Sequence, residues 1–297
     1  TMPTLHRADF RLMNLECVMS NTGHKWDQTA KVFHFRSDLK NIQCLKDAKI
    51  DMLSCANNHV LDYSYEAMAE MLATFNNIDY PYVGIGNNLA QASQMKIAEV
   101  NNLKIGVISC TDNEPGWEAS NNKMGARYLK IDRRDHRYQI LLQQIKEQRP
   151  LVDLLIISIH WGGNWGINPP PQHRQLGHDI IDSGGDIIFG HSAHIIRGVE
   201  VYQGKPIIYS GGDFVDDYAI DRKQRNDLGG IFEITVDSNC QLQNLIFHPT
   251  MIKDLQVNLA TGNDKSLISD RFIKMCQEMN CNPVASPTQL QINLQQY

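Results

Sequence analysis

The sequence predicts an α/β protein in which two sheets pack face to face with helices outside. Apolar runs rich in Ile and Leu, such as those within residues 154–160 and 186–190, have the composition of strands covered on both faces. Segments with the apolar spacing of helices, such as residues 133–148 and 172–183, lie between these runs. From residue 199 onward, strands follow one another with little helix, which is typical of an antiparallel meander. A layered α/β fold accommodates both halves.

The individual elements follow from two periods in the sequence. Apolar runs predict strands at residues 10–16, 50–55, 82–85, 105–110, 154–160, 186–190, 206–210, 230–236 and 242–247. A period near 3.6 predicts helices at residues 37–48, 63–75, 90–95, 133–148, 172–183 and 265–279. Two segments rich in turn-forming residues, 112–124 and 164–171, predict long loops over the strand ends. Long loops in a compact domain are usually functional.

The length and composition describe a protein with a sizeable core. A chain of 297 residues with 42% hydrophobic content accommodates one large domain. We expect that domain to span residues 1–255, with a C-terminal helix and a polar tail, residues 256–297, packed on it. The formal charge is −5, and no lysine or arginine run exceeds the Arg133-Arg134 pair. Nucleic acid is therefore not an expected partner.

The cysteines and the lack of long apolar stretches bear on the compartment. Seven cysteines without a Cys-x-x-Cys spacing predict neither a zinc knuckle nor a disulfide framework, and they favour a reducing compartment. No apolar stretch reaches the roughly 18 residues that span a bilayer, and the first residues lack a signal peptide's charged and apolar regions. We expect a cytoplasmic protein with no membrane span in this chain. A leader or anchor ahead of Thr1 stays an open alternative.

Side chains that bind metals follow the ends of several predicted strands. In open α/β sheets ligands collect beyond the carboxyl ends of the strands, so residues placed there converge. Neutral imidazole, carboxylate and amide oxygen are ligands for Mn, Zn and Fe class ions. A carboxylate also bridges two ions about 3.5 to 4 Å apart. We therefore predict a site for one or two divalent ions, built from Glu16, Asn58, His160, His191 and His194. Any one of these residues alone is more simply explained as structural, and the hypothesis depends on the whole set.

His59 and Asp62 are the predicted catalytic residues. Neighbouring side chains in extended backbone point to opposite sides, so Asn58 binds the ion while His59 is available for proton transfer. Asp62, three residues further on, orients His59 in one interpretation. In the other interpretation Asp62 caps the helix that follows it.

Five motifs resemble, in their order, the CapA family of poly-γ-glutamate capsule synthesis proteins, which is related to the calcineurin-like metallophosphoesterases. The motifs are Asn14-Leu15-Glu16, Ala56-Asn57-Asn58-His59-Val60-Leu61-Asp62, His160-Trp161-Gly162, Gly190-His191-Ser192-Ala193-His194 and Tyr209-Ser210-Gly211-Gly212-Asp213-Phe214. Five ordered motifs over roughly residues 8–250 make the resemblance specific. It implies a four-layer α/β/β/α sandwich of the metallo-dependent phosphatase type.

The resemblance also implies a role for each matching residue. Glu16 stands where the superfamily places a bridging carboxylate. Asn58 resembles the ligand of one ion, and His59 resembles a residue that assists the leaving group. His160 and His191 resemble ligands of the same ion as Asn58, whereas His194 resembles a ligand of its neighbour.

The chain departs from the family pattern at two positions. The family opens with a strand ending in Gly-Asp, whose Asp binds the first metal, and no such pair precedes Glu16. Either that opening strand lies outside this chain, or the protein is a one-metal or degenerate member. Asp213 stands in a Gly-Gly-Asp-Phe context where many relatives carry Gly-Asn-Phe. We assign Asp213 no catalytic role on that basis.

Four further residues are candidates for contacting the substrate: Trp161, Asn164, Arg197 and Asp112. Trp161 and Asn164 fall in the loop region after His160, and Asp112 ends a strand. Arg197 follows the double-histidine turn, and a guanidinium grips phosphate or carboxylate in a two-pronged manner. Arg197 is equally compatible with an exposed surface residue. Tryptophans in such loops are more often anchors than substrate platforms.

These observations predict a metal-dependent hydrolase of the metallophosphoesterase superfamily. Metal-bound hydroxide would attack a phosphoester or acyl centre while His59, supported by Asp62, protonates the leaving group. The substrate would be an anionic small molecule or polymer, and the CapA resemblance links it to poly-γ-glutamate and capsule synthesis. One alternative is a catalytically weak accessory protein of a capsule or polyglutamate assembly. Another is a polymer- or peptide-binding module that holds no metal. The oligomeric state stays open.

Overall fold

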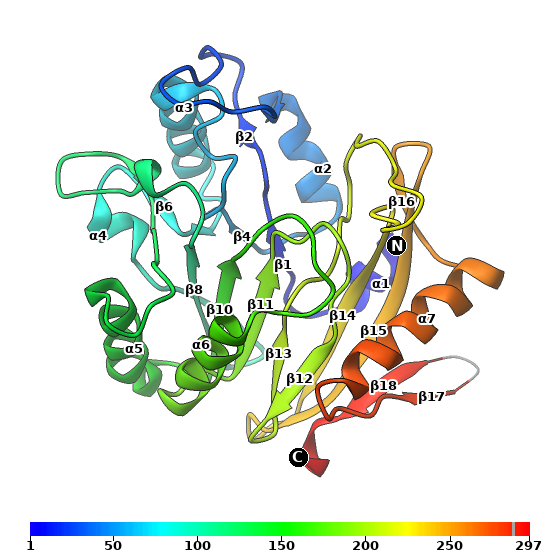
Figure 1. Cartoon of the computed structure of the whole chain (residues 1–297). Coiled ribbons are helices and arrows are strands. Elements are labelled where there is room, and N and C mark those ends of the chain that lie inside the picture. The colour runs from blue at the N-terminus through cyan, green and yellow to red at the C-terminus, as the bar shows by residue number, and fades with distance from the viewer. Residues whose placement is uncertain (287–288) are drawn as a thin grey trace. The chain divides into compact units, whose positions relative to one another are not determined.

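The chain divides into two units, which are described separately. The structure is a computed structural model that describes residues 1–286 and 289–297 (Figure 1). The N-terminal unit comprises residues 2–138 and 158–160, and the C-terminal unit comprises residue 1 with residues 139–157 and 161–297. Helix α5 (His136–Gln148) and strand β10 (Leu154–His160) run across the division.

The N-terminal unit contains a parallel sheet with the strand order β1-β4-β5. Its strands are β1 (Leu12–Asn14), β4 (Met52–Ser54) and β5 (Tyr82–Val83), and each residue of β1 is in register with one of β4. Around this sheet the chain forms α1 (Met2–Arg7), β2 (Val18–Met19), β3 (Arg36–Ser37), η1 (Leu39–Asn41), α2 (Ile42–Asp47) and α3 (Ser64–Asn77). The predicted strand ends at 16 and 55 therefore belong to neighbouring parallel strands, and they point in the same direction.

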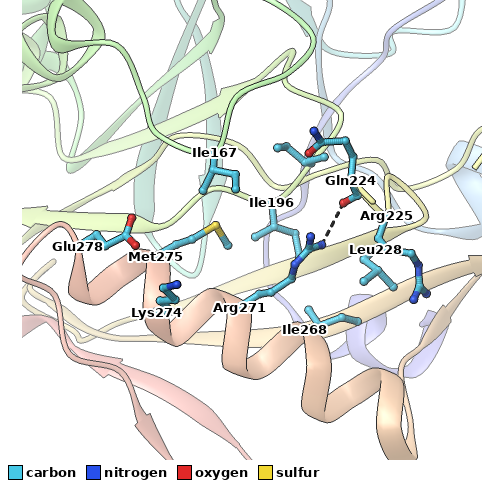
Figure 2. A pocket seen from close by; sticks show the side chains of 11 residues that line it. Ile167, Ile196, Gln224, Arg225, Leu228, Ile268, Arg271, Lys274, Met275 and Glu278 are labelled. Atoms are coloured by element: carbon cyan, nitrogen blue, oxygen red, sulfur yellow. Dashed lines mark hydrogen bonds between the residues drawn. The ribbon is translucent and has the colours of Figure 1, made fainter. Parts of the chain in front are cut away.

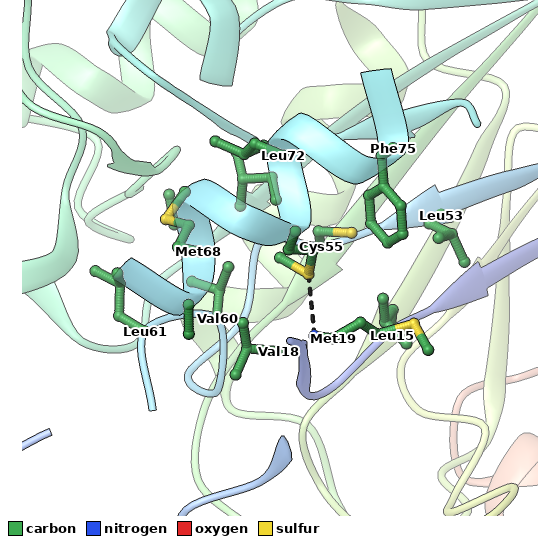
Figure 3. Close-up of a cluster of buried hydrophobic side chains, with 14 of the residues drawn as sticks. Leu15, Val18, Met19, Leu53, Cys55, Val60, Leu61, Met68, Leu72 and Phe75 are labelled. Atoms are coloured by element: carbon green, nitrogen blue, oxygen red, sulfur yellow. Dashed lines mark hydrogen bonds between the residues drawn. The ribbon is translucent and has the colours of Figure 1, made fainter. Parts of the chain in front are cut away.

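Helix α3 supplies most of the core of this unit. Its buried residues Ala67, Met68, Met71, Leu72 and Phe75 recur at helical spacing, so they form one apolar stripe. The stripe packs on residues of β2, β4 and the loop after β4 (Figure 3). The backbone N–H of Met19 also donates to the Met71 sulfur at 3.3 Å. Burying each such side chain contributes about 1.5–3 kcal/mol, so α3 fixes the loop that carries the Asn-Asn-His motif.

The rest of the N-terminal unit is a hairpin and a pair of short strands. Strands β7 (Lys96–Val100) and β8 (Leu103–Thr111) pair antiparallel. The two residues between them, Asn101 and Asn102, both have positive φ, at 50° and 66°. Two consecutive positive φ values are what a tight hairpin turn needs, and asparagine tolerates them. The unit also contains β6 (Ile85–Gly86), α4 (Leu89–Ala92), η2 (Pro115–Trp117) and β9 (Gly125–Ala126).

The C-terminal unit begins with strands in the order β12-β13-β11-β10. Strand β11 (Ile187–His191) pairs parallel with β13 (Lys205–Ile208), and β12 (Val199–Tyr202) pairs antiparallel with β13. All seven residues of β10 are buried, as its Ile- and Leu-rich sequence predicts for a central strand. The helical elements here are η3 (Arg149–Leu151) and α6 (Pro171–Asp182).

The same unit contains a second, antiparallel sheet, as the strand-rich sequence after residue 199 predicts. Its strands are β14 (Leu228–Val236), β15 (Leu242–Lys253), β16 (Gln256–Leu259), β17 (Val284–Ala285) and β18 (Leu290–Asn293), and it is accompanied by α7 (Gly262–Gln277) and η4 (Leu294–Gln296). Helix α7 packs on this sheet, where Phe272 stacks on Phe247 at 4.1 Å between ring centroids.

The C-terminal tail is part of this core. Strand β18 pairs with β15, and Leu290, Ile292 and Leu294 are buried. The predicted domain boundary at residue 255 falls within the β15–β16 pair, where Lys253 lies opposite Gln256. Polar Gln291 and Asn293 alternate with the buried residues, which is why the tail reads as polar in the sequence. Across the described part of the chain, no helix has both the length and the apolar character that crossing a membrane requires.

Candidate metal centre

Three of the predicted site residues meet in the N-terminal unit. Glu16 lies two residues after β1, His59 in the loop after β4, and His160 at the last position of β10. Glu16 Oε1 is 3.8 Å from His160 Nε2 and 4.0 Å from His59 Nε2. Both imidazoles are buried, whereas the Glu16 side chain is 22% exposed. A carboxylate and two imidazoles from three strand ends therefore converge, as the sequence predicts.

Buried serine hydroxyls hold these strand ends in place. Ser54 Oγ lies 2.8 Å from Ser109 Oγ, and Ser158 Oγ donates to Ser54 Oγ at 2.8 Å. Ser158 precedes His160 by two residues on the same strand, so both side chains leave the strand on the same side. The backbone N–H of Asp112, directly after β8, donates to the His160 carbonyl at 3.1 Å.

Two asparagines that the sequence did not assign position the ligating residues. Asn14 Nδ2 donates to Glu16 Oε2 at 2.8 Å. Fully buried Asn57 donates from Nδ2 to the Leu15 carbonyl at 2.8 Å and to Asn14 Oδ1 at 3.2 Å, and its Oδ1 accepts from the His59 backbone N–H at 3.0 Å. The first asparagine of the Asn-Asn-His motif therefore joins the Glu16 loop to the His59 loop.

The amide oxygen of Asn58 is a candidate ligand for a cation. This Oδ1 atom is buried and has no hydrogen-bond partner among the described residues. A buried acceptor left in this way costs about 1–3 kcal/mol. Coordination of a divalent ion would satisfy it, because amide oxygen is a ligand for hard and borderline ions.

His59 and Asp62 form a buried dyad. His59 Nδ1 lies 2.5 Å from Asp62 Oδ2, and the Asp62 side chain is fully buried. Asp62 Oδ2 also accepts from the backbone N–H of Phe35 at 2.6 Å, and the Phe35 ring stacks on the His59 ring at 4.0 Å. The alternative in which Asp62 caps a helix is wrong, because α3 begins at Ser64 with Tyr63 at its N-cap and no capping side-chain bond. Asp62 instead orients His59, so that His59 Nε2 is directed toward Glu16.

A buried lysine completes this group, and no sequence pattern pointed to it. Lys31, in the segment between β2 and β3, donates to the Asn58 carbonyl at 2.6 Å and lies 3.3 Å from Asp62 Oδ1. Its side chain is only 8% exposed.

His191 and His194 belong to the C-terminal unit. His191 ends β11 and is buried, and burial lowers the pKa of its imidazole to about 3. It is therefore neutral at neutral pH, which is the form that binds metals. That these two histidines join the same centre as Glu16 and His160 stays a prediction.

His194 has an acidic partner. Its Nδ1 lies 2.8 Å from Asp213 Oδ1, and a carboxylate on one ring nitrogen is the usual partner of a metal-binding histidine. Burial and the charge of Asp213 raise the pKa of nearby Asp216 to about 7. Asp213, to which the sequence assigned no catalytic role, is thus a positioning residue for His194.

The four predicted substrate-contacting residues differ in exposure. Trp161 is fully buried, with its ring stacked on His173 at 5.1 Å and on Tyr209 at 5.6 Å, so it does not present a surface to substrate. Arg197 is also buried and donates from Nε to the Gly166 carbonyl at 2.8 Å. Trp161 is therefore a core residue, and Arg197 holds the loop that follows β10.

The other two candidates are accessible. Asn164 is exposed on the loop that Arg197 holds. Asp112 is half-buried, and its carboxylate accepts from Asn113 Nδ2 at 2.9 Å. Only these two of the four have accessible side chains.

A cavity in the C-terminal unit is lined by none of the predicted site residues. It has a volume of about 180 Å³ and lies between α7 and segments 195–196 and 224–228 (Figure 2). Aliphatic side chains line most of it, with Arg271 and Lys274 from α7. Arg271 donates to the Gln224 carbonyl at 3.0 Å and to the Lys223 carbonyl at 3.2 Å. It therefore connects α7 to the loop that precedes β14.

The donor types fit a divalent ion, but the donors are not closed around one point. Within residues 1–286 and 289–297, no group of three or more His, Cys, Asp or Glu side chains is close enough together to hold a metal ion. Glu16, His160 and the buried Asn58 oxygen are an incomplete coordination set that small side-chain movements would have to close.

Comparison with known proteins places this arrangement in a family. Residues 1–218 match the model described as "Bacterial capsule synthesis protein PGA_cap". The chain is 26% identical over 293 residues to a probable polyglutamine synthesis accessory protein of Mycobacterium tuberculosis, covering 95% of this chain and 76% of that protein. It is 31% identical over 217 residues to the PGA biosynthesis protein CapA of Bacillus subtilis, and 27% identical over 274 residues to the capsule biosynthesis protein CapA of Bacillus anthracis.

Coverage of the two CapA proteins is partial. The matches cover 72% and 90% of this chain but 55% and 62% of those proteins. Among solved structures, a hypothetical protein of Thermus thermophilus matches with a TM-score of 0.46 and 12% identity, over 86% of this chain and 87% of that chain. A 5'-nucleotidase precursor of the same organism matches with a TM-score of 0.45 and 14% identity, over 82% and 46% of the respective chains.

Proposed function

This chain belongs to the family of bacterial capsule synthesis proteins, and from that premise we propose that it is a metal-dependent hydrolase. Its reaction would be cleavage of a phosphoester or acyl centre in an anionic small molecule or polymer. The names of its relatives suggest a role in making or handling poly-γ-glutamate. The observation that carries the proposal is the convergence of Glu16 and His160 beside an oriented His59–Asp62 dyad.

The proposed centre uses donors of the N-terminal unit, where Glu16, Asn58 and His160 would hold an ion. Metal binding by His191 and His194, in the C-terminal unit, is a separate proposal that rests on the family resemblance. When bound, a divalent ion activates water at neutral pH and offsets the charge that develops on the attacked group. The four-layer packing of the two sheets, which the family resemblance implies, belongs to the same proposal.

The chain's own residues supply the proton. Asp62 accepts at His59 Nδ1, so it fixes the tautomer and stabilises the charged imidazolium. His59 Nε2 is then the atom that gives a proton to the departing oxygen. The stacked Phe35 ring and the buried setting keep the imidazole from rotating and exclude water from one of its faces.

The experiment is turnover of bis-p-nitrophenyl phosphate with added Mn²⁺, together with the metal content of protein purified without chelator. We expect Mn²⁺-dependent turnover in the wild type and a loss of at least about 100-fold in His160→Ala. His136→Ala is the matched control, because His136 is exposed on α5. Equal turnover in wild type and His160→Ala contradicts the proposal.

The second candidate is an accessory protein without turnover. The open spacing of the donor groups favours it, because no group of three acidic, histidine or cysteine side chains in the described part of the chain is closed around an ion. Metal binding with no turnover of any phosphoester or γ-glutamyl substrate supports this candidate over the hydrolase.

A further inference from the structure

Lys31 connects three loops of the N-terminal unit through a side chain that is 8% exposed. Its Nζ donates to the carbonyl of Asn58 at 2.6 Å and lies 3.3 Å from Asp62 Oδ1 and 3.4 Å from Glu114 Oε1. The amine also sits over the Trp117 ring, 4.8 Å from its centroid. These contacts reach the loop between β2 and β3, the Asn-Asn-His loop and the loop after β8.

A lysine in this position is costly unless it does something that a smaller residue cannot. Taking an ammonium group out of water carries a penalty of several kcal/mol, and an ion pair repays it only with good geometry. A purely structural link between loops would need no charge. The carboxylates that face Lys31, from Asp62 and Glu114, show where that charge acts.

The charge acts on the acceptor that orients His59. Asp62 is fully buried, and its Oδ2 receives the hydrogen bonds of His59 Nδ1 and the Phe35 N–H. Lys31 faces the other oxygen, Oδ1. One cation therefore compensates the buried carboxylate from the side opposite the imidazole, while its bond to the Asn58 carbonyl fixes the backbone next to His59.

We propose that Lys31 is a positioning residue for leaving-group protonation, acting on His59 through the Asp62 carboxylate and the Asn58 carbonyl. The inference rests on the proposed hydrolase function, and it makes the protein selective for leaving groups that depart with a proton. An alkoxide or unactivated phenolate needs the His59 proton, whereas p-nitrophenolate departs without one. Lys31 then matters for the first class of ester and little for the second.

The test compares the wild type with Lys31→Met, Lys31→Gln and Lys31→Arg. The two substrates are diphenyl phosphate and bis-p-nitrophenyl phosphate. We expect Lys31→Met to lower kcat for the phenyl ester at least about tenfold more than for the p-nitrophenyl ester. Lys31→Arg keeps the charge, so we expect it to recover most of the kcat that Lys31→Met loses on the phenyl ester. Lys31→Gln keeps a donor for the Asn58 carbonyl without the charge, and it serves if Lys31→Met does not fold. Lys123→Met, at an exposed lysine of the same unit, is the matched control.

A second readout separates this inference from the hydrolase proposal. The Nδ1 proton of His59, in a short bond to Asp62, should give a slowly exchanging downfield resonance that is present in the wild type and lost in Lys31→Gln. If no variant turns over either ester, the hydrolase proposal fails, yet this resonance still tests the role of Lys31. An unchanged resonance in Lys31→Gln overturns the inference, as does an equal loss of kcat on both esters.

Discussion

Asn57 illustrates how a single buried amide holds the candidate site together. It makes three hydrogen bonds: two from Nδ2 join it to the Glu16 segment, and one to Oδ1 fixes the His59 backbone beside it. Truncation would leave the Leu15 carbonyl and the His59 N–H buried without these partners. We expect Asn57→Ala to lower the free energy of unfolding by about 2–4 kcal/mol.

Urea unfolding followed by circular dichroism measures this cost. Asn164→Ala is the control, because Asn164 is exposed on a loop, and we expect it to change stability by less than about 0.5 kcal/mol. Equal stabilities for the two variants would show that Asn57 does not position the motif.

Asp213 leads to a prediction about metal affinity. Its carboxylate orients His194 through Nδ1, and loss of such a partner typically lowers metal affinity about 10- to 100-fold. We expect Asp213→Asn to weaken Mn²⁺ binding by that factor in calorimetric titration. The neighbouring exposed Asp217→Asn variant should bind as the wild type does. Identical Mn²⁺ affinities for both variants would show that His194 does not bind the metal.

At the residue scale, strand-end position was the informative signal. Glu16, His59 and His160 were predicted because each follows a strongly apolar strand, and they do converge. Lys31 was not predictable, because its role arises from three loops that only the folded chain brings together. Trp161 was misassigned, because a sequence does not show that the ring stacks inward on Tyr209.

At the scale of elements, α3 is the support of the Asn-Asn-His loop. Phe75 is fully buried at the end of its apolar stripe, and it contacts the rings of Tyr80 and Tyr82 at 5.9 and 5.7 Å between centroids. Removing the ring leaves a cavity that the neighbouring side chains fill only in part. We expect Phe75→Ala to destabilise the protein by about 3–5 kcal/mol.

Thermal and urea unfolding both report this change. Ile140→Ala on α5 is the matched control, since Ile140 is 58% exposed, and its effect should stay within about 0.5 kcal/mol. If Phe75→Ala lowers the free energy of unfolding no more than Ile140→Ala does, the described packing of α3 is wrong.

A buried glutamate joins β12 to α6 and makes stability depend on pH. Burial raises the pKa of Glu200, but hydrogen bonds from Arg174, Tyr209 and His178 outweigh it and hold the pKa below its usual value. The folded state therefore binds this proton less readily than the unfolded chain. The stabilisation is present above the usual glutamate pKa of about 4.5 and is lost as the pH falls through the lower folded value.

We expect Glu200→Gln to destabilise the protein by about 1–3 kcal/mol at pH 7, with the difference from wild type shrinking below about pH 4. Urea unfolding at a series of pH values measures it. Glu147→Gln, at an exposed position on α5, should show no such dependence. If the stability difference between Glu200→Gln and wild type stays constant down to pH 3, the ionised Glu200 carboxylate is not its source.

Elements were predictable where composition is uniform and obscure where strands lie at sheet edges. Strand β10 was predicted to the residue, because five of its seven residues are Leu or Ile and all seven are buried. Strand β7 was missed, because exposed Ile97 and Glu99 alternate with half-buried neighbours, and that pattern does not reveal its pairing with β8. The predicted helix at 37–48 is instead two elements. Residues 39–41 form the tighter 3-10 turn η1, and the α-helix α2 begins only at Ile42.

At the scale of the whole molecule, the predicted family and the predicted mixed α/β class are confirmed, whereas the four-layer arrangement stays a proposal. The matched family model covers residues 1–218, so it includes every predicted site residue. The two units divide those residues, with Glu16, Asn58, His59 and His160 in one and His191 and His194 in the other. Each unit therefore carries part of the predicted set, and the group in the N-terminal unit carries the proposed function.

The most direct test is a crystal structure of the protein grown with Mn²⁺, with anomalous diffraction recorded at the manganese edge. The account predicts an anomalous peak about 2.0–2.3 Å from Glu16 Oε1, Asn58 Oδ1 and His160 Nε2. An anomalous map without a peak at these atoms, or with manganese bound only elsewhere, would contradict it.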